Sequence, residues 1–252
     1  MENKKIPKNH TSQRLSAFGL LFVLSLTLIF FTSPVKAEPA GATVSNNVTA
    51  TSAAATPDNR SDAGGTITTM LLSTVQQDAN WKAYVGNVSG SLTLDDANGN
   101  TIYSWALSAA EVTGELYISK SINVGWSTLG CSSDGLINSE DTTIGFSAIS
   151  ADSINRTFNE TTHDAIFVAG RTINQDTCRT TATFVNDSQQ SIASANFPEI
   201  ILASGTDLVY MTPLNQGSDS FVNESLVDFQ AIVPDDVTTA ITRYYFYVEI
   251  GS

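Results

Sequence analysis

Basic residues are scarce in this chain. Of its 252 residues only 12 are Lys or Arg, against 25 Asp or Glu, and the formal net charge is −13. An acidic surface repels the phosphates of nucleic acids and the anionic head groups of lipids. We therefore expect no nucleic-acid partner. We interpret the negative charge as a contribution to solubility, with weak and diffuse cation binding as the alternative.

Histidine is scarce as well. Beyond the N-terminal region the chain holds a single histidine, His163, so a Ser-His-Asp triad would have to use it, and no G-x-S-x-G motif is present. We interpret His163 as a surface or loop residue. The paired acids Asp95-Asp96, Glu140-Asp141 and Asp235-Asp236 are adjacent in sequence, whereas a glycosidase needs two carboxyls across a cleft. We therefore predict that the protein is not an enzyme and needs no cofactor; a glycosidase is the least favoured alternative.

One acidic segment invites comparison with a calcium-binding loop. Ser133 to Asp141 is similar to the second half of an EF-hand loop if Gly135 takes the sixth position. The first and third ligand positions then fall on Gly130 and Ser132, which carry no carboxylate, and the twelfth position lacks a Glu. We predict no metal site and keep calcium binding here as a minor alternative.

Cysteine is limited to Cys131 and Cys178. An even number of cysteines in an oxidising compartment predicts a disulfide. The bond would close a loop of roughly 46 intervening residues, for which the chain-entropy model gives about 3–4 kcal/mol of stabilisation. Two separate buried thiols are the alternative.

The first 37 residues have the pattern of a signal peptide. A basic start precedes an apolar run of 14 residues, Phe18 to Phe31, and the small residues Val35 and Ala37 suit signal peptidase, with the cut before Glu38. A membrane-spanning helix needs about 20 apolar residues. We predict a secreted or cell-surface protein, extracellular or periplasmic, with no membrane span after cleavage; an uncleaved N-terminal anchor is the alternative.

The exported chain, residues 38–252, is more acidic still. Removal of residues 1–37 takes away five of the 12 basic and one of the 25 acidic side chains, which leaves 7 and 24 and a formal charge of −17. Residues 38–65 are rich in Ala, Ser, Thr and Asn and hold only Val44 and Val48 as sizeable apolar side chains. We expect this spacer to be disordered. Residues 66–252 are enough for one domain.

The stretch from Asn80 to Trp105 predicts a β-hairpin. Asn98-Gly99 suits a two-residue type I′ turn, which would pair Ala97 with Asn100. This register places Leu94 opposite Tyr103, Leu92 opposite Trp105, Thr93 opposite Ser104 and Asp95 opposite Ile102. We expect the Leu/Tyr/Trp face to be kept out of water, because a shift of one residue would reverse the two faces.

Many further short segments have strand character and are separated by turn residues. The predicted strands are Thr66–Val75, Val112–Lys120, Ala165–Val168, Thr180–Val185, Ile200–Ala203, Leu208–Met211, Val227–Val233 and Arg243–Ile250. One short helix is predicted to begin with Ser139 as its N-cap. This pattern predicts an all-β fold, with a single β-sandwich domain over residues 66–252. An immunoglobulin-like and a jelly-roll strand order remain equally open.

Three aromatic residues are candidates for an interaction face. The last predicted strand carries Tyr245 and Tyr247 on one side, which the sandwich covers or which a partner meets by strand addition. An exposed Trp126 would stack on sugar rings.

Asparagine is placed for N-glycosylation at several points. Asn87, Asn155, Asn159, Asn186 and Asn223 each precede x-Ser or x-Thr, as do Asn47 and Asn59. These are possible glycosylation sites if the source organism glycosylates its exported proteins.

Four stretches of the chain, taken together, carry a resemblance. The signal peptide, the Thr/Ser/Asn-rich spacer, the stretch GGTITTMLLSTVQQDANWKAYVGNVSGSLTLDDANGNTIYSW and the closing RYYFYVEIG resemble a group of prokaryotic secreted surface proteins of unassigned function. The resemblance implies a cell-surface or filament-associated structural role and brings no catalytic residues. We therefore expect a non-enzymatic surface or appendage component that binds itself or other surface proteins. An extracellular, adhesin-like glycan-binding module is the alternative.

Overall fold

The computed structural model describes residues 38–53, 56–74, 76–106, 112–147, 149–222, 225–236 and 241–251. The predicted signal peptide, residues 1–37, lies outside these ranges. Among the helices of the described ranges, none has both the length and the apolar character needed to cross a membrane.

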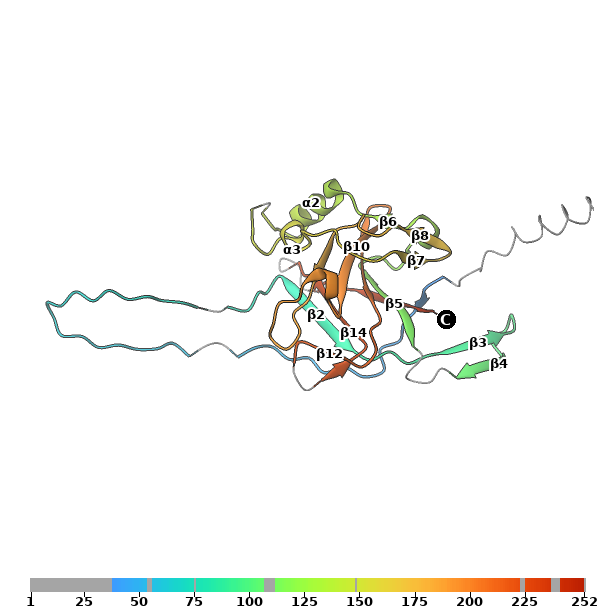
Figure 1. Ribbon diagram of the computed structural model, residues 1–252, viewed down its shortest axis with the longest axis horizontal. Helices are drawn as coiled ribbons and strands as arrows, with labels where there is room; N and C mark the ends of the chain where they lie inside the picture. Colours follow the sequence, from blue (N-terminus) through green and yellow to red (C-terminus); the bar gives the residue numbers. More distant parts are fainter. Residues whose placement is uncertain are drawn as a thin grey trace, which may run out of the picture. The chain divides into compact units, whose positions relative to one another are not determined.

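Short strands dominate the described residues (Figure 1). The strands are β1 (Ala40–Gly41), β2 (Trp81–Gly86), β3 (Ser91–Asp95), β4 (Thr101–Ala106), β5 (Thr113–Ser119), β6 (Gly130–Cys131), β7 (Ile166–Val168), β8 (Arg171–Ile173), β9 (Thr180–Ala182), β10 (Pro198–Ser204), β11 (Asp207–Pro213), β12 (Ser218–Asp219), β13 (Leu226–Val227), β14 (Phe229–Pro234) and β15 (Tyr245–Gly251). The helices are α2 (Asp134–Thr143) and α3 (Ile154–Thr157), with 3₁₀ turns η2 (Trp126–Thr128) and η3 (Ile192–Ser194). The predicted all-β fold class is confirmed.

A seven-stranded antiparallel sheet forms the centre of the fold. Its order is β1-β15-β5-β11-β10-β6, and β9 also pairs with β10. Strand β5 lies in the middle, where Leu116 pairs with Val248 of β15 on one side and with Thr212 of β11 on the other. The predicted alternation in β5 is present, with Leu116 and Ile118 on one face and Tyr117 on the other.

Both faces of the central sheet are buried. On one face, Ile118, Ile201 and Tyr210 pack with Ala231 and Val233 of β14, which pairs with β2 to form the opposing layer of the sandwich. Residues of α2 and α3 join this core. On the other face a second core lies beneath the β7–β8 hairpin; its buried members include Tyr117, Trp126, Leu129, Ile166, Val168, Ile173, Leu202 and Val209.

The first predicted strand differs from expectation. In the spacer, Ala40 and Gly41 pair with Val248 and Tyr247 of β15, and the other described spacer residues form no helix or strand. Thr66 to Thr74 forms no strand, and the prediction of a strand over Thr66–Val75 is wrong for these described residues. Figure 1 shows this part of the chain without an arrow between β1 and β2. The β-branched composition is present, but no neighbouring strand in the described chain pairs with it.

The β3–β4 hairpin has the predicted side-chain register but a different turn. Leu92 faces Trp105 and Leu94 faces Tyr103, as predicted. The loop has three residues rather than two, because Asp96 pairs with Asn100 and the register shifts so that Asp95 faces Thr101. The Asp96 carboxylate accepts the N–H groups of Asn98 and Asn100, both at 2.8 Å, and Gly99 takes a φ of +81°. Such a loop needs glycine at its left-handed position, so the same residues serve a different turn.

Helix α2 begins earlier than predicted. Its N-cap is Ser133, whose hydroxyl accepts the N–H of Leu136 at 3.2 Å, and Ser139 lies inside the helix. The segment compared with an EF-hand loop is therefore helical, which rules out that loop geometry. Asp141 of α2 accepts the N–H of Ile154 at 2.7 Å and joins α2 to α3.

Capping by Ser133 leads to a first prediction. Ser133→Ala removes the acceptor for the first turn of α2 and should lower the free energy of unfolding by about 1 kcal/mol. The matched control is Ser139→Ala at an exposed position inside the helix, where alanine should be neutral or slightly stabilising. Urea unfolding of both variants checks this; equal losses would contradict the cap assignment.

Candidate functional site

The two cysteines form a disulfide, as predicted. Cys131 of β6 and Cys178 are bonded with their Cα atoms 4.9 Å apart. Cys178 is fully buried in the second core. The bond therefore ties the edge of the central sheet to the chain that leads into β9.

His163 is buried beside this disulfide, in the loop before β7, so the predicted loop position is correct and the surface position is wrong. Its Nε2 accepts the N–H groups of Thr177 at 3.1 Å and Cys178 at 2.9 Å. Its Nδ1 lies 2.6 Å from the carbonyl oxygen of Asp164. Because Nε2 accepts two hydrogen bonds, the proton of the neutral ring is on Nδ1, which donates to that carbonyl. Both ring nitrogens thus hold the backbone around the disulfide.

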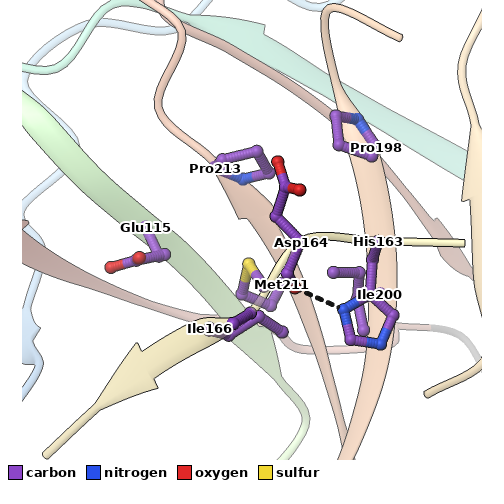
Figure 2. A pocket seen from close by; sticks show the side chains of 9 residues that line it. Glu115, His163, Asp164, Ile166, Pro198, Ile200, Met211 and Pro213 are labelled. Atoms are coloured by element: carbon purple, nitrogen blue, oxygen red, sulfur yellow. Dashed lines mark hydrogen bonds between the residues drawn. The ribbon is translucent and has the colours of Figure 1, made fainter. Parts of the chain in front are cut away.

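A small cavity of about 110 Å³ lies next to His163 (Figure 2). Figure 2 shows the Asp164 carboxylate directed towards Pro213 and away from the imidazole, while Glu115 comes from β5. The rest of the lining is mostly apolar and includes Ile200 and Met211. The Asp164 carboxylate therefore does not face the imidazole in this cavity.

Acidic residues gather at the β5–β15 pair. Glu115 and Glu249 lie opposite each other across the two strands, and the hydroxyl of Tyr117 lies 3.4 Å from Oε2 of Glu249 and donates to it. Burial, followed by the negative charge of the two glutamates, raises the pKa of Tyr117 above its usual value. The phenol therefore stays protonated as a hydrogen-bond donor.

Glu199 is a fully buried carboxyl between the two layers of the sandwich. It comes from β10, and its Oε2 accepts the N–H of Ile232 on β14 at 2.8 Å. Burial raises the pKa of Glu199 well above 4.5, and the hydrogen bond from Ile232 only partly offsets this. Glu199 thus connects the central sheet to β14 by one hydrogen bond.

The predicted aromatic interaction face is largely covered. Trp126 is 8% exposed, and its ring makes edge-to-face contacts with Tyr117 at 5.3 Å and Tyr247 at 5.1 Å. The expectation that Trp126 is exposed for stacking on sugars is therefore wrong. Tyr247 donates its hydroxyl to the carbonyl of Ile122 at 2.9 Å, and Tyr245 is half-buried. Of the two alternatives for the face of Tyr245 and Tyr247, the structure has the one in which the sandwich covers it.

An exposed apolar face lies instead on the β3–β4 hairpin. Leu92, Leu94, Tyr103 and Trp105 share one side of it and are between 40% and 57% exposed. The rings of Tyr103 and Trp105 meet edge to face at 4.7 Å. Within the described ranges β3 and β4 pair only with each other. The residues predicted to be kept from water thus form an uncovered surface.

The possible glycosylation sites differ in accessibility. Asn87 and Asn159 are exposed, Asn155 and Asn186 are partly buried, and Asn223 lies outside the described residues. Glycosylation itself stays a prediction.

No group of three or more His, Cys, Asp or Glu side chains placed to hold a metal ion occurs among the described residues. Comparisons with protein-family models, with curated proteins and with solved structures found no match for this chain.

Loss of the disulfide should be costly. The free energy of unfolding of Cys131→Ser/Cys178→Ser is expected to be about 3–4 kcal/mol lower than that of the native protein, because the unfolded chain without the disulfide has more conformational entropy. Chemical denaturation of the variant and of the native protein, each with and without reductant, measures the loss. A native protein that is unaffected by full reduction would contradict this expectation.

The buried Glu199 should make stability depend on pH. Below about pH 4.5 the carboxyl is protonated in both states, and above it only the unfolded chain ionises, so the folded state loses stability as the pH rises. Glu199→Gln should remove this loss. The difference in unfolding free energy between Glu199→Gln and the native protein should therefore shift in favour of the variant between pH 4 and pH 8. Parallel stability curves would show that Glu199 ionises normally.

Proposed function

We propose that this chain is a secreted, non-enzymatic structural subunit that self-associates in a cell-surface or appendage assembly. The carrying observation is the uncovered apolar face of the β3–β4 hairpin, formed by Leu92, Leu94, Tyr103 and Trp105. A contiguous exposed patch of large apolar side chains is typical of a protein interaction site.

Energetics favour an occupant for this face. An isolated two-stranded hairpin is marginally stable in water, and its order depends on contacts with another surface. Fully burying one side chain of this size contributes roughly 1.5–3 kcal/mol. The four side chains carry no charge, so two copies can meet here without placing like charges together, although the exported chain has a formal charge of −17.

Export and a structural role have separate support. The disulfide is typical of proteins that leave the reducing cytoplasm, and the pattern of residues 1–37 favours a cleaved signal peptide. His163 supports a non-catalytic role, because its Nε2 accepts two backbone N–H groups and its Nδ1 donates to a carbonyl.

The same hairpin favours glycan binding as a second candidate. Tyr103 and Trp105 are exposed rings on one face, in the way that aromatic side chains of sugar-binding sites are presented. Self-association ranks first because Leu92 and Leu94 belong to the same face. Their side chains cannot form hydrogen bonds with the hydroxyl groups of a sugar.

Removal of the two aromatic rings tests the proposal. We expect the exported chain to form oligomers in sedimentation velocity as its concentration rises. Tyr103→Ser/Trp105→Ser should raise the midpoint of this assembly at least about thirtyfold, because buried aromatic residues at interface centres are worth about 2 kcal/mol or more.

The matched control is Thr93→Ala/Ser104→Ala on the opposite face of the same hairpin, which should assemble like the native chain. A native chain that stays monomeric at all concentrations would overturn self-association. If that monomer bound oligosaccharides on a glycan array and lost the binding with the two rings, the second candidate would replace the first.

A further inference from the structure

A second unpaired apolar element lies N-terminal to β2. The donor segment, Thr66–Thr74, forms no strand and is exposed, with Ile67 at 100% and Leu71 at 101% of full exposure. Met70 and Leu72 are exposed as well. In an extended chain successive side chains alternate, so Ile67 and Leu71 share one face while Met70 and Leu72 share the other. A strand of this kind needs apolar surface on both sides.

Strand β2 has an edge that suits such a segment. It pairs antiparallel with β14, so every second residue of β2 bonds to β14. The hydrogen bond from the Asp235 N–H to the Asn80 carbonyl shows that these are the even-numbered residues. Lys82 and Tyr84 therefore bond towards β14, while the backbone groups of Ala83 and Val85 point to the opposite edge. Among the described residues no strand pairs with that edge.

Apolar surface flanks β2 on both sides. Towards solvent, Ala83 and Val85 line a hollow of about 400 Å³ that also touches Ile232, Phe184 and Phe221. The hollow is lined mostly by apolar atoms and contains no charged side chain. Towards the core, Tyr84 is only half-buried and its ring meets Phe246 edge to face at 5.0 Å. An added strand would cover Ala83 and Val85 at the β2 side of the hollow, while Ile232 and Gln230 line it from β14.

We propose that the donor segment of one copy adds as a strand to the exposed edge of β2 in a second copy. This inference rests on the proposed self-association and adds a second contact to the one made by the β3–β4 hairpin. At about 3.3 Å per residue the nine-residue segment spans roughly 30 Å, against roughly 20 Å for the six residues of β2. The donor segment is therefore long enough to pair along the whole strand.

Charge favours a second copy as the occupant. The chain is uncharged from Ala63 to Gln77, and the hollow beside β2 is uncharged too. The one charged residue of β2, Lys82, is paired with Asp235 at 3.0 Å, so the contact brings no like charges together in an otherwise acidic protein. Within one copy the donor segment stays exposed, and Oε1 of Gln77 accepts the N–H of Ser52 in the spacer at 2.8 Å.

Strand addition by the N-terminal region already occurs in this fold. Ala40 and Gly41 add to the edge of β15, and the N–H of Ala42 donates to the carbonyl of Phe246 at 2.8 Å. In the proposed contact the donating and accepting surfaces differ. A head-to-tail contact of this kind forms open filaments when its rotation does not close a ring, as an appendage requires.

A labelled peptide tests the contact directly. The probe is the synthetic peptide TITTMLLSTVQQ, Thr66 to Gln77, and the target is the exported chain carrying Leu71→Asp/Leu72→Asp, which disables its own donor segment. Fluorescence anisotropy should show saturable binding. Adding Val85→Asp to the target should weaken binding at least about tenfold, because it buries an unpaired charge at the edge. Ile122→Asp, at another exposed apolar position, should leave binding unchanged.

Assembly of the intact chain gives the second readout. Leu71→Asp/Leu72→Asp should raise the midpoint of assembly, because only the hairpin contact then remains, while Val44→Asp/Val48→Asp, which adds the same charge to the exposed spacer, should not. No peptide binding overturns the inference. The inference is also overturned if the peptide binds the Leu71→Asp/Leu72→Asp target while the native chain stays monomeric and does not bind the peptide. Each donor segment then pairs with the β2 edge of its own chain.

The two proposals fail differently. If Leu71→Asp/Leu72→Asp assembles like the native chain while Tyr103→Ser/Trp105→Ser does not, strand addition is overturned and self-association through the hairpin stands.

Discussion

The pairing of β5 with β15 on one side and β11 on the other is the interaction on which the rest of the structure depends. It brings the C-terminal strand beside β5, the middle strand of the sheet, next to residues more than 120 positions earlier. Tyr117 and Ile118 are fully buried on opposite faces of β5. Each face therefore needs its own cover: β2, β14 and the two helices supply one, and the β7–β8 hairpin with the disulfide-linked chain supplies the other.

This arrangement divides the apolar residues unevenly. The central sheet is buried on both faces, and even His163 and Glu199 hold the backbone in place there. The β3–β4 hairpin and the donor segment, in contrast, keep large apolar side chains in water. Exposure of this kind costs free energy that a second copy can recover. The function we propose follows from this difference between a core whose apolar side chains are buried and two strand elements whose apolar side chains are exposed.

Local pattern predicted most of the strands but not their surroundings. The alternation in β5 and the pairs Leu92–Trp105 and Leu94–Tyr103 depend on neighbouring residues, and the predictions were confirmed. Exposure depends on tertiary contacts, so Trp126 was wrongly expected at the surface. Ser133 and Ser139 both precede acidic residues, and local sequence alone did not separate the cap from a helical position. The apolar residues of the two uncovered surfaces were visible in the sequence, but their exposure depends on tertiary contacts that a local pattern does not contain.

Hydrogen exchange of the native protein tests the central claim most directly, because it reports on backbone amides in the monomeric and assembled states without any substitution. The account predicts that amides of the donor segment and of β2 at Ala83 and Val85 exchange rapidly in dilute protein and become protected on assembly, together with those of the β3–β4 hairpin. Rapid exchange of all of these amides in assembled protein would contradict the account.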